Sequence, residues 1–448
     1  MIRFIDLFAG IGGIRLGFEQ AMRNMDIDAK CVLSSEINAH SQETYSLNFG
    51  ETPQGDIYGI KKYPEFDFLL AGFPCQPFSY AGKQRGFGDT RGTLFFEIER
   101  LIAKHQPNGF LLENVRGLTT HDGGRTLQTI VEKLESLGYG VNCLLLNSSD
   151  FNVPQNRVRV YIAGIKNAVP KTTLQSGRGA SDSHQYKLLR LVDNLSLVTK
   201  SLRVRDVLEA NPPKSYDCST SFQDSVQKVL KQKKLAANGV RLIDFRNGNS
   251  IHSWELGIKG ECSVGELEFM NALIANRRKK IFGSHQDGKS LTPEQIRTFF
   301  DHPELQKIMD SLVKKRYLRL RDGLYNPVSG NMSFEVFKLL DPDSISITLV
   351  TSDAHKLGVF HLGRLRHITP RECARLQGYP DTFVHHPVDV HAYRQFGNSV
   401  SVPVIQAVVT DLFVNNPLLK TLQKNTAKLG LKSGRKTSVC HSTMSAVG

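Results

Sequence analysis

The sequence predicts an α/β protein with a largely parallel sheet and a second domain of mixed structure inserted into it. Between residues 1 and 165, short apolar runs alternate with amphipathic helical patterns, which is typical of βαβ units. The alternation stops after residue 166, and a globular pattern returns after about residue 362. A glycine-rich turn follows the first apolar run directly, as in sheets that bind a ligand at the carboxyl ends of their strands.

The expected strands are short apolar runs bounded by turn residues, and they lie at residues 3–8, 29–34, 66–71, 109–112, 141–147 and 157–164. The expected helices have apolar residues at every third or fourth position, and they lie at about 14–25, 92–105 and 124–137. A capping box at Thr369 with Pro370 in the first turn predicts a further short helix, and a last helix is expected near 398–413.

Composition narrows the class of protein. The 448-residue chain has a formal net charge of +14, which favours a polyanionic partner. Its seven cysteines are scattered without a C-x-x-C pair, so neither a disulfide framework nor a cysteine zinc site is expected. No apolar run has the length of a membrane span, and the first residues enter a strand pattern without a signal peptide. We therefore expect a reduced, cytoplasmic setting without membrane attachment.

The middle of the chain has its own order. Helical patterns at 265–281 and 303–315 flank a capped helix start at Thr292, and an Asp-Gly turn within 317–325 predicts a hairpin. Three helices and a basic hairpin resemble a winged-helix DNA reader, and an ordinary helical insertion with a solvated basic face explains the pattern equally well. From residue 420 the chain is basic and free of acids, which predicts a disordered tail.

Cys75 is the candidate nucleophile. It follows the buried strand at 66–71 and lies between Pro74 and Pro77, so its backbone is stiff and its thiol stands where α/β sheets bind substrates. A buried structural cysteine is the alternative, but such a residue does not usually lie between prolines in a polar loop.

Further candidate residues follow other strands. The turn at 6–13, the acid Glu36 and the pair Asp56-Ile57 together describe a site for an adenosine-containing cofactor. Glu113 ends another strand and is a candidate acid. Arg157 and Arg159 are two residues apart in an expected strand, so their side chains would share one face. There they could bind an anion or a carbonyl, and the alternative is that they form salt bridges on an edge strand.

These motifs, in the order in which they occur along the chain, resemble those of the DNA (cytosine-5)-methyltransferases of bacterial restriction–modification systems. The matching segments are 6–13, 36, 55–57, 72–79, 113–115, 155–161, 371–380 and 395–400. The resemblance implies an S-adenosylmethionine-dependent, Rossmann-like fold with a seven-stranded sheet. The catalytic and cofactor-binding domain would comprise residues 1–166 and 362–415, the target recognition domain 167–361, and a basic tail 416–448.

The resemblance also implies roles for single residues. Cys75 would attack C6 of a cytosine flipped out of duplex DNA, Glu113 would hold N3 and the exocyclic amine, and Arg159 would contact O2 with Arg157 in support. Residues at the cofactor positions of the family are Phe8, Gly10, Gly12, Glu36, Asp56, Ile57, Pro74, Leu94, Asn398 and Val400. Residues expected to contact DNA are Lys83 and Arg85 in a mobile loop, together with Gln155, Lys314, Lys315 and Thr348.

The expected cofactor is S-adenosylmethionine without a metal, and the expected partner of a monomeric enzyme is double-stranded DNA, with a restriction endonuclease as a functional counterpart. Two alternatives stay open: a tRNA cytosine-5 methyltransferase on the same fold, and a non-catalytic DNA-binding regulator. The long middle region favours duplex DNA. A nicotinamide dehydrogenase is disfavoured because the glycines do not follow the G-x-G-x-x-G spacing.

Overall fold

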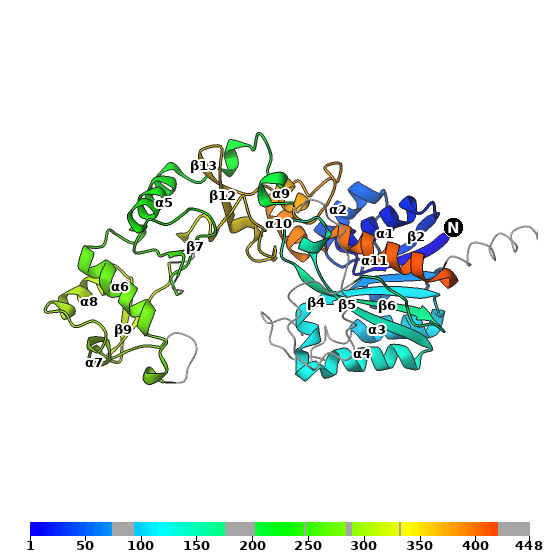
Figure 1. Cartoon of the computed structure of the whole chain (residues 1–448), viewed down its shortest axis with the longest axis horizontal. Coiled ribbons are helices and arrows are strands. Elements are labelled where there is room, and N and C mark those ends of the chain that lie inside the picture. The colour runs from blue at the N-terminus through cyan, green and yellow to red at the C-terminus, as the bar shows by residue number, and fades with distance from the viewer. Residues whose placement is uncertain (74–93, 175–201, 246–247, 284–288, 331–332, 420–448) are drawn as a thin grey trace, which may run out of the picture. The chain divides into compact units, whose positions relative to one another are not determined.

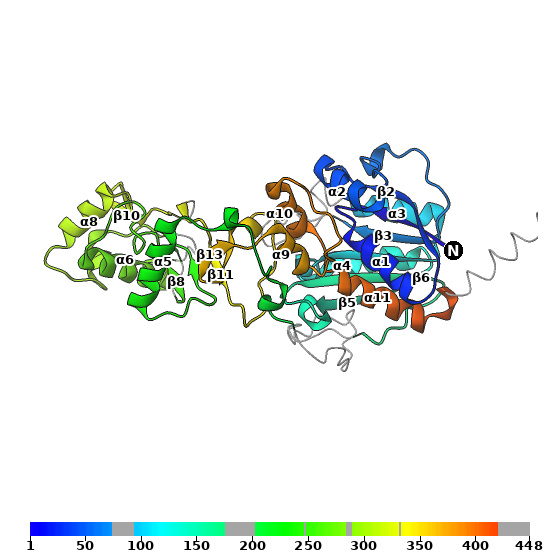
Figure 2. The same ribbon diagram turned by 90° about the horizontal axis from the view of Figure 1, so that it is seen from above.

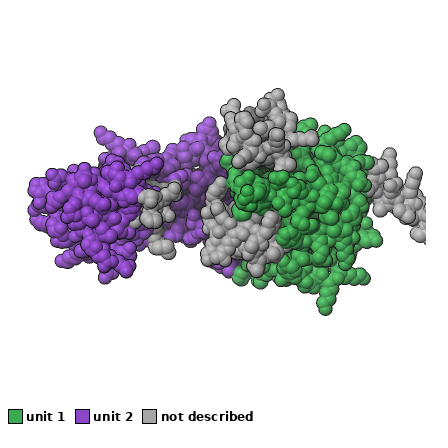
Figure 3. Space-filling model, turned by 90° about the horizontal axis from the view of Figure 1, so that it is seen from below, with its two compact units in different colours: residues 1–151, 158–199, 400–448 green, residues 152–157, 200–399 purple. Residues whose placement is uncertain are grey.

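The computed structural model describes residues 1–73, 94–174, 202–245, 248–283, 289–330 and 333–419 (Figure 1). The chain forms two compact units (Figure 3). The first comprises residues 1–151, 158–199 and 400–448, and the second comprises 152–157 and 200–399. Residues 362–399 therefore pack with the middle of the chain. The division into a catalytic and a recognition domain is a functional one and stays a prediction.

The first unit contains a six-stranded sheet in the order β2-β1-β3-β4-β6-β5, in which β6 is antiparallel to both of its neighbours. All six strands expected from the apolar runs are present. They are β1 (Ile2–Leu7), β2 (Ala29–Ser35), β3 (Phe68–Gly72), β4 (Gly109–Val115), β5 (Tyr139–Asn147) and β6 (Val158–Lys166).

The described residues do not form the seventh strand that the family resemblance implies. Next to β2 there is only an isolated parallel bridge between Ser35 and Gln54. Gln54 N donates to Ser34 O (2.8 Å) and Glu36 N donates to Gln54 O (2.8 Å), and the pairing extends no further. Pro53 precedes Gln54 and has no N–H to donate, so the ladder cannot lengthen in that direction.

Helices cover both faces of this sheet, as Figure 1 shows from the side and Figure 2 from above. On one face, α1 (Gly13–Asn24) packs against α11 (Val402–Asn415) over a core that includes Phe4, Phe18 and Phe68. On the other face, α3 (Leu94–His105) and α4 (Arg125–Ser136) bury a second apolar cluster. These helices confirm the predictions that were made from the spacing of apolar residues.

The remaining helix of this unit, α2 (Ala39–Phe49), was not predicted because its apolar residues lack a helical period and only Thr44 and Tyr45 are buried. The residues that indicate this helix in the sequence are the capping residues at its two ends. The Asn38 side chain accepts from Ser41 N at the start, and Gly50 ends the helix with a φ of 70°.

The second unit contains a five-stranded sheet in the order β13-β12-β11-β7-β8. Its strands are β7 (Arg241–Leu242), β8 (Ser250–Ile251), β11 (Lys338–Leu340), β12 (Leu357–His361) and β13 (Arg364–His367). Its helices outside the insertion described below are α5 (Thr220–Lys233), α9 (Pro370–Arg375) and α10 (Asp389–Asn398). The predicted capping box is present: Thr369 Oγ1 accepts from Glu372 N (3.1 Å), and the Glu372 carboxylate accepts from Thr369 N (2.8 Å).

A buried ion pair fixes α9 in this unit. Arg366 and Glu372 are both fully buried, and the guanidinium donates to the two carboxylate oxygens at 2.7 and 2.8 Å. The same carboxylate accepts from Glu209 N (2.8 Å). A buried ion pair is stabilised when its remaining polar atoms are also hydrogen-bonded. The bond from Glu209 N does this, and it ties the segment at Glu209 to the start of α9.

The predicted helices and hairpin of the middle region are present, with a hydrophobic core of their own that includes Trp254, Phe269 and Tyr317. Helix α6 ends earlier than the pattern at 265–281 indicated. The elements are α6 (Val264–Asn276), α7 (Pro293–Arg297), α8 (Leu305–Lys314), β9 (Leu318–Arg321) and β10 (Leu324–Pro327).

One helical stretch, Asp389–Asn415, is long and apolar enough to cross a membrane by composition alone. In the structure it is divided into α10 and α11 around an extended Ser399, and 61% of its most apolar window is buried inside the protein. This is how core helices of a globular protein behave.

Candidate active site

Two of the candidate catalytic side chains, Glu113 and Arg159, meet at the carboxyl end of β4. Gly72 at the end of β3 pairs in register with Glu113 on β4, and Val115 pairs with Arg159 on the antiparallel strand β6. A Cβ atom built on Gly72 would lie 3.7 Å from Glu113 Oε2. The carboxylate therefore lies against the strand end that leads into Cys75.

Glu113 and Arg159 form an ion pair. Arg159 Nε lies 3.1 Å from Glu113 Oε1, and both side chains are largely buried, with 14% of Arg159 and 10% of Glu113 exposed. Arg159 Nη1 also donates to Val158 O (2.9 Å). A largely buried carboxylate held beside a guanidinium at a strand end is of the kind that binds polar ligands.

Asn114 supports this corner and was not singled out in the sequence. Its side chain is buried, and its Nδ2 donates to Phe73 O (3.3 Å), which ties β4 to the residue that follows β3. The only feature of the sequence that could have indicated Asn114 is its position next to Glu113, a candidate acid at a strand end. Cys75, Pro74, Lys83 and Arg85 lie outside the described residues, so their predicted roles rest on the sequence.

The glycine-rich turn and the acid Glu36 are brought together. Gly10 N donates to Glu36 Oε2 (2.8 Å), and Glu36 Oε1 accepts from Asn38 N (2.8 Å). Gly10 and Gly12 have φ values of 56° and 84°, and within the part of the chain that the structure describes no atom outside the turn lies within 4 Å of a Cβ built on Gly10. The backbone here is shaped to let a ligand approach closely.

The start of α1 is also suited to a ligand. Its N-cap residue is Gly12, no side chain caps the helix, and no acid lies in the first turn. The first N–H groups of a helix have no partners within the helix and carry a partial positive charge. An uncapped start next to an open glycine turn therefore fits the carboxylate of an amino-acid-like cofactor.

The other predicted cofactor residues lie in different surroundings. The Asp56 carboxylate accepts from Tyr58 N (3.0 Å), Ile57 is buried in the core, and Phe8 has a φ of 55°. Ile37 directly follows Glu36 and is 75% exposed, which is unusual for an isoleucine and marks an apolar surface that the sequence reasoning missed.

The remaining three predicted cofactor residues are divided between the units. Leu94 begins α3, and Val400 is buried in the core that contains Ile14. Asn398 is at the end of α10 in the second unit, where its Oδ1 accepts from the Thr351 hydroxyl.

Below the glycine turn lies a buried polar cluster. Asp6 on β1 is fully buried, and neither carboxylate oxygen has a hydrogen-bond partner among the described residues. Burial raises the pKa of the Asp6 carboxyl to about 8, although nearby Arg15 opposes the rise. The Arg15 guanidinium itself bonds Glu19 (2.7 Å), the Tyr45 hydroxyl (2.9 Å) and Glu51.

The two arginines of the predicted strand have different positions. Strand β6 begins at Val158, so Arg157 lies just before it and belongs to the second unit. Its guanidinium is buried and donates to the carbonyl oxygens of Leu349 (2.9 Å), Gly397 (3.4 Å) and Ser399. Arg157 thus holds backbone segments together, and the expectation that it shares a strand face with Arg159 is wrong.

Gln155 was expected to contact DNA, and the structure corrects this. The side chain is fully buried, its Nε2 donates to Leu376 O (2.6 Å) and its Oε1 accepts from Leu349 N (2.8 Å). Both ends of the amide are therefore already bonded to backbone. Thr348 lies beside this segment, and its hydroxyl donates to Asn156 O.

The two predicted DNA-binding lysines also differ. Lys314 is exposed at the end of α8. Lys315 Nζ donates to both Glu266 oxygens (2.8 and 2.7 Å) and to Glu261 O (2.7 Å), which uses all three of its N–H groups. Arg319 and Arg321 on β9 are exposed. Lys314 and these hairpin arginines are therefore among the exposed cations of this module, whereas Lys315 has a structural partner.

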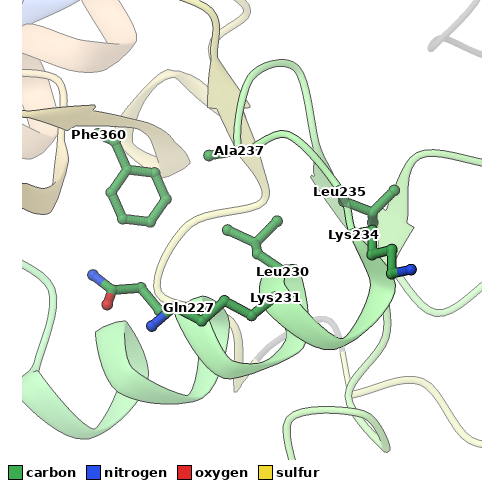
Figure 4. A pocket seen from close by; sticks show the side chains of 7 residues that line it. All are labelled: Gln227, Leu230, Lys231, Lys234, Leu235, Ala237 and Phe360. Carbon is green, nitrogen blue, oxygen red and sulfur yellow. The ribbon is translucent and has the colours of Figure 1, made fainter.

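A shallow groove of about 410 Å³ lies in the second unit (Figure 4). Leu230, Leu235 and Phe360 give it apolar walls, and Lys231 and Lys234 lie at its rim. None of the predicted site residues lines it, so the groove adds no group to the candidate active site.

Comparison with known proteins identifies the class. The family of C-5 cytosine-specific DNA methylases matches residues 2–414. The chain belongs to this family, and its activity class is DNA (cytosine-5)-methyltransferase.

Individual relatives are similar over nearly their whole length. The chain is 65% identical over 413 residues to the Type II methyltransferase M.HgiCI of Herpetosiphon aurantiacus, covering 92% of this chain and 98% of the relative. It is 62% identical over 416 residues to the Type II methyltransferase M.BanI of Aneurinibacillus aneurinilyticus, covering 93% and 96%. A solved candidate DNA modification methyltransferase from an E. coli prophage shares the fold, with a TM-score of 0.50, 22% identity and coverage of 93% and 99%.

We predict that Asp6→Asn changes how stability depends on pH. The folded protein keeps the Asp6 proton up to about pH 8, whereas the unfolded chain loses it near pH 4. Between these values the unfolded state binds fewer protons, so wild-type stability falls as the pH rises. The variant cannot ionise, and urea unfolding should show it gaining up to about 1.4 kcal/mol per pH unit relative to wild type between pH 5 and 8.

The matched control is Asp28→Asn, which changes an exposed acid before β2. Its difference from wild type should stay constant over the same range. A constant difference for Asp6→Asn as well would show that Asp6 is ionised in the folded protein.

Proposed function

We propose that this chain is the modification enzyme of a type II restriction–modification system and methylates C5 of a specific cytosine in double-stranded DNA. The observation that carries the proposal is the Glu113–Arg159 pair at the strand end that leads into Cys75. The Type II names of relatives at 62–65% identity support it. The enzyme would act as a monomer in the bacterial cytoplasm, where its methylation protects DNA from a cognate nuclease.

The chemistry explains why these residue types are needed. C5 of cytosine is a weak nucleophile, and addition of the Cys75 thiolate to C6 makes C5 enamine-like. Glu113 holds N3 and the exocyclic amine as charge shifts into the ring, and Arg159 contacts O2. After methylation, loss of the C5 proton and release of Cys75 restore the aromatic ring. The base must leave the helix stack because the ring has to meet Cys75 and the methyl donor together.

The residues of the first unit fit S-adenosylmethionine as the methyl donor. The uncapped start of α1 would bind its carboxylate, Glu36 its ribose hydroxyls, and Asp56, Ile57 and Ile37 would surround its adenine. When bound, this group supplies an activated methyl on a sulfonium. The open space beside Gly10 supports this assignment, because a side chain there would occupy room that the ligand needs.

The second unit would carry target recognition. The module formed by α6, α7, α8 and the β9–β10 hairpin has its own core and presents Lys314, Arg319 and Arg321 to solvent. We assign these cations, rather than Lys315 or Gln155, to phosphate contacts. Thr348 stays in the proposed DNA-binding set.

We predict that Cys75→Ala abolishes methyl transfer while DNA binding persists, because the thiol makes a bond to the base and is not needed to hold the duplex. Transfer of radiolabelled methyl groups to duplex DNA, with a mobility-shift assay beside it, measures both properties. The wild-type protein should form a covalent adduct with DNA containing 5-fluorocytosine. The absence of an adduct would favour a non-catalytic regulator, and transfer to tRNA alone would identify an RNA enzyme.

For Glu113→Gln we expect a loss of several orders of magnitude in turnover with little change in affinity for S-adenosylmethionine, since the carboxylate holds the base and not the cofactor. Single-turnover rates and equilibrium binding of the cofactor separate the two effects. The control is Glu135→Gln, an exposed acid on α4, which should match wild type. A large loss of cofactor affinity in Glu113→Gln would place Glu113 in the cofactor site instead.

Replacing Lys314 and Arg319 with alanine should weaken DNA binding and reduce its salt dependence. Each lost phosphate contact lowers the slope of log affinity against log salt by about 0.9. Lys315→Ala should leave the slope unchanged and instead lower thermal stability, because it leaves the Glu266 carboxylate without its partner. Equal slopes for wild type and the Lys314/Arg319 double variant would exclude this module from DNA contact.

A further inference from the structure

A cluster of three different side chains lies at one end of the five-stranded sheet of the second unit. The Cys218 Sγ, a carboxylate oxygen of Glu335 and a ring nitrogen of His367 all lie within 4.8 Å of one another. None of them belongs to the candidate active site. We propose that Cys218, Glu335 and His367 form a zinc site that fastens the recognition unit.

The topology brings three segments that are distant in sequence to this point. His367 ends β13, and Cys218 lies beside that strand, with Cys218 N donating to Leu365 O (3.0 Å). Glu335 lies just before β11, on the stretch where Phe337 N donates to Lys356 O (2.8 Å) next to β12. Since these contacts are backbone hydrogen bonds of the sheet, the three ligand positions are held by the fold itself.

The imidazole of His367 is oriented as a ligand. Its Nδ1 lies 2.8 Å from His355 O, and a carbonyl can only accept, so Nδ1 carries the proton. The lone pair is then on Nε2. A ligating histidine typically donates its other N–H to a carbonyl or carboxylate, which is the arrangement seen here.

Glu335 is oriented in the same way. One carboxylate oxygen accepts from Ser219 N (2.8 Å) and the other from the Ser219 hydroxyl (2.5 Å). Ser219 is the N-cap of α5 and directly follows Cys218, so the capping residue also fixes the carboxylate next to the thiol. Each oxygen retains a lone pair for a metal ion.

Cys218 is suited to bind zinc. Its side chain is buried, and its thiol hydrogen-bonds the Glu335 carboxylate. In this setting a dication takes the place of the thiol proton and neutralises both the sulfur and the carboxylate. The proton is released to solvent when the zinc–sulfur bond forms.

The donor set selects zinc among the common ions. Thiolate, imidazole and carboxylate are its usual ligands at about 2.0–2.3 Å, which places ligand atoms about 3.5 Å apart. Glu335 and His367 are half-exposed, which leaves a fourth position for water. The bound ion would close chain loops of more than 100 residues, from 218 to 335 and from 218 to 367.

The test uses the full chain, purified without a histidine tag or chelator. Elemental analysis should find one zinc per chain, and cobalt substitution should give a thiolate-to-cobalt charge-transfer band. His367→Gln is the deciding variant because its half-exposed side chain can be replaced without disturbing the core. It should lose more than about tenfold in zinc affinity and abolish the fall in melting temperature that a chelator causes in wild type.

Cys218→Ser should remove the cobalt band, and Cys262→Ser, which changes a partly exposed thiol elsewhere in the same unit, should keep both metal and band. Two results would overturn the proposal. One is wild-type protein with no more zinc than His367→Gln and no response of its melting temperature to zinc. The other is full zinc binding by folded His367→Gln.

Discussion

The ion pair between Glu113 and Arg159 depends on the reversal of direction between β4 and β6. The register pairs Glu113 with Tyr161 and Val115 with Arg159, so the acid and the arginine are diagonal neighbours across the two antiparallel strands. Here Arg159 enters at the beginning of β6, opposite the end of β4. A cation and an acid therefore meet at one point, next to Gly72 at the end of β3.

Much of this arrangement could be predicted from the sequence. Strands of a sheet covered on both faces are continuous apolar runs, so all six were recognisable, and Glu36 and Glu113 were marked by their positions at strand ends. Strands β7 and β8 have only two residues each and show no period. The burial of Gln155 was also unpredictable, because its backbone partners lie 194 and 221 residues away in the chain.

The corrected residues share one physical reason. Gln155, Arg157 and Lys315 are polar residues in basic or polar surroundings, and such residues are usually exposed. In the structure each one is hydrogen-bonded to partners within its own unit. Charge and polarity in a sequence therefore identify groups that need a partner, while only the fold decides whether that partner is a ligand or the protein itself.

The contacts of Gln155 and Arg157 have a consequence for how such enzymes diversify. The hydrogen bonds described above join these two side chains to main-chain atoms at Leu349, Leu376, Gly397 and Ser399. Main-chain groups are the same whatever residue occupies a position. The side chains at Leu349, Leu376 and Ser399 can thus be exchanged, by evolution or in engineered chimeras, without losing these attachments, provided that the backbone path is kept. Gly397 is the exception, because a Cβ atom there would lie 2.5 Å from Thr351 N.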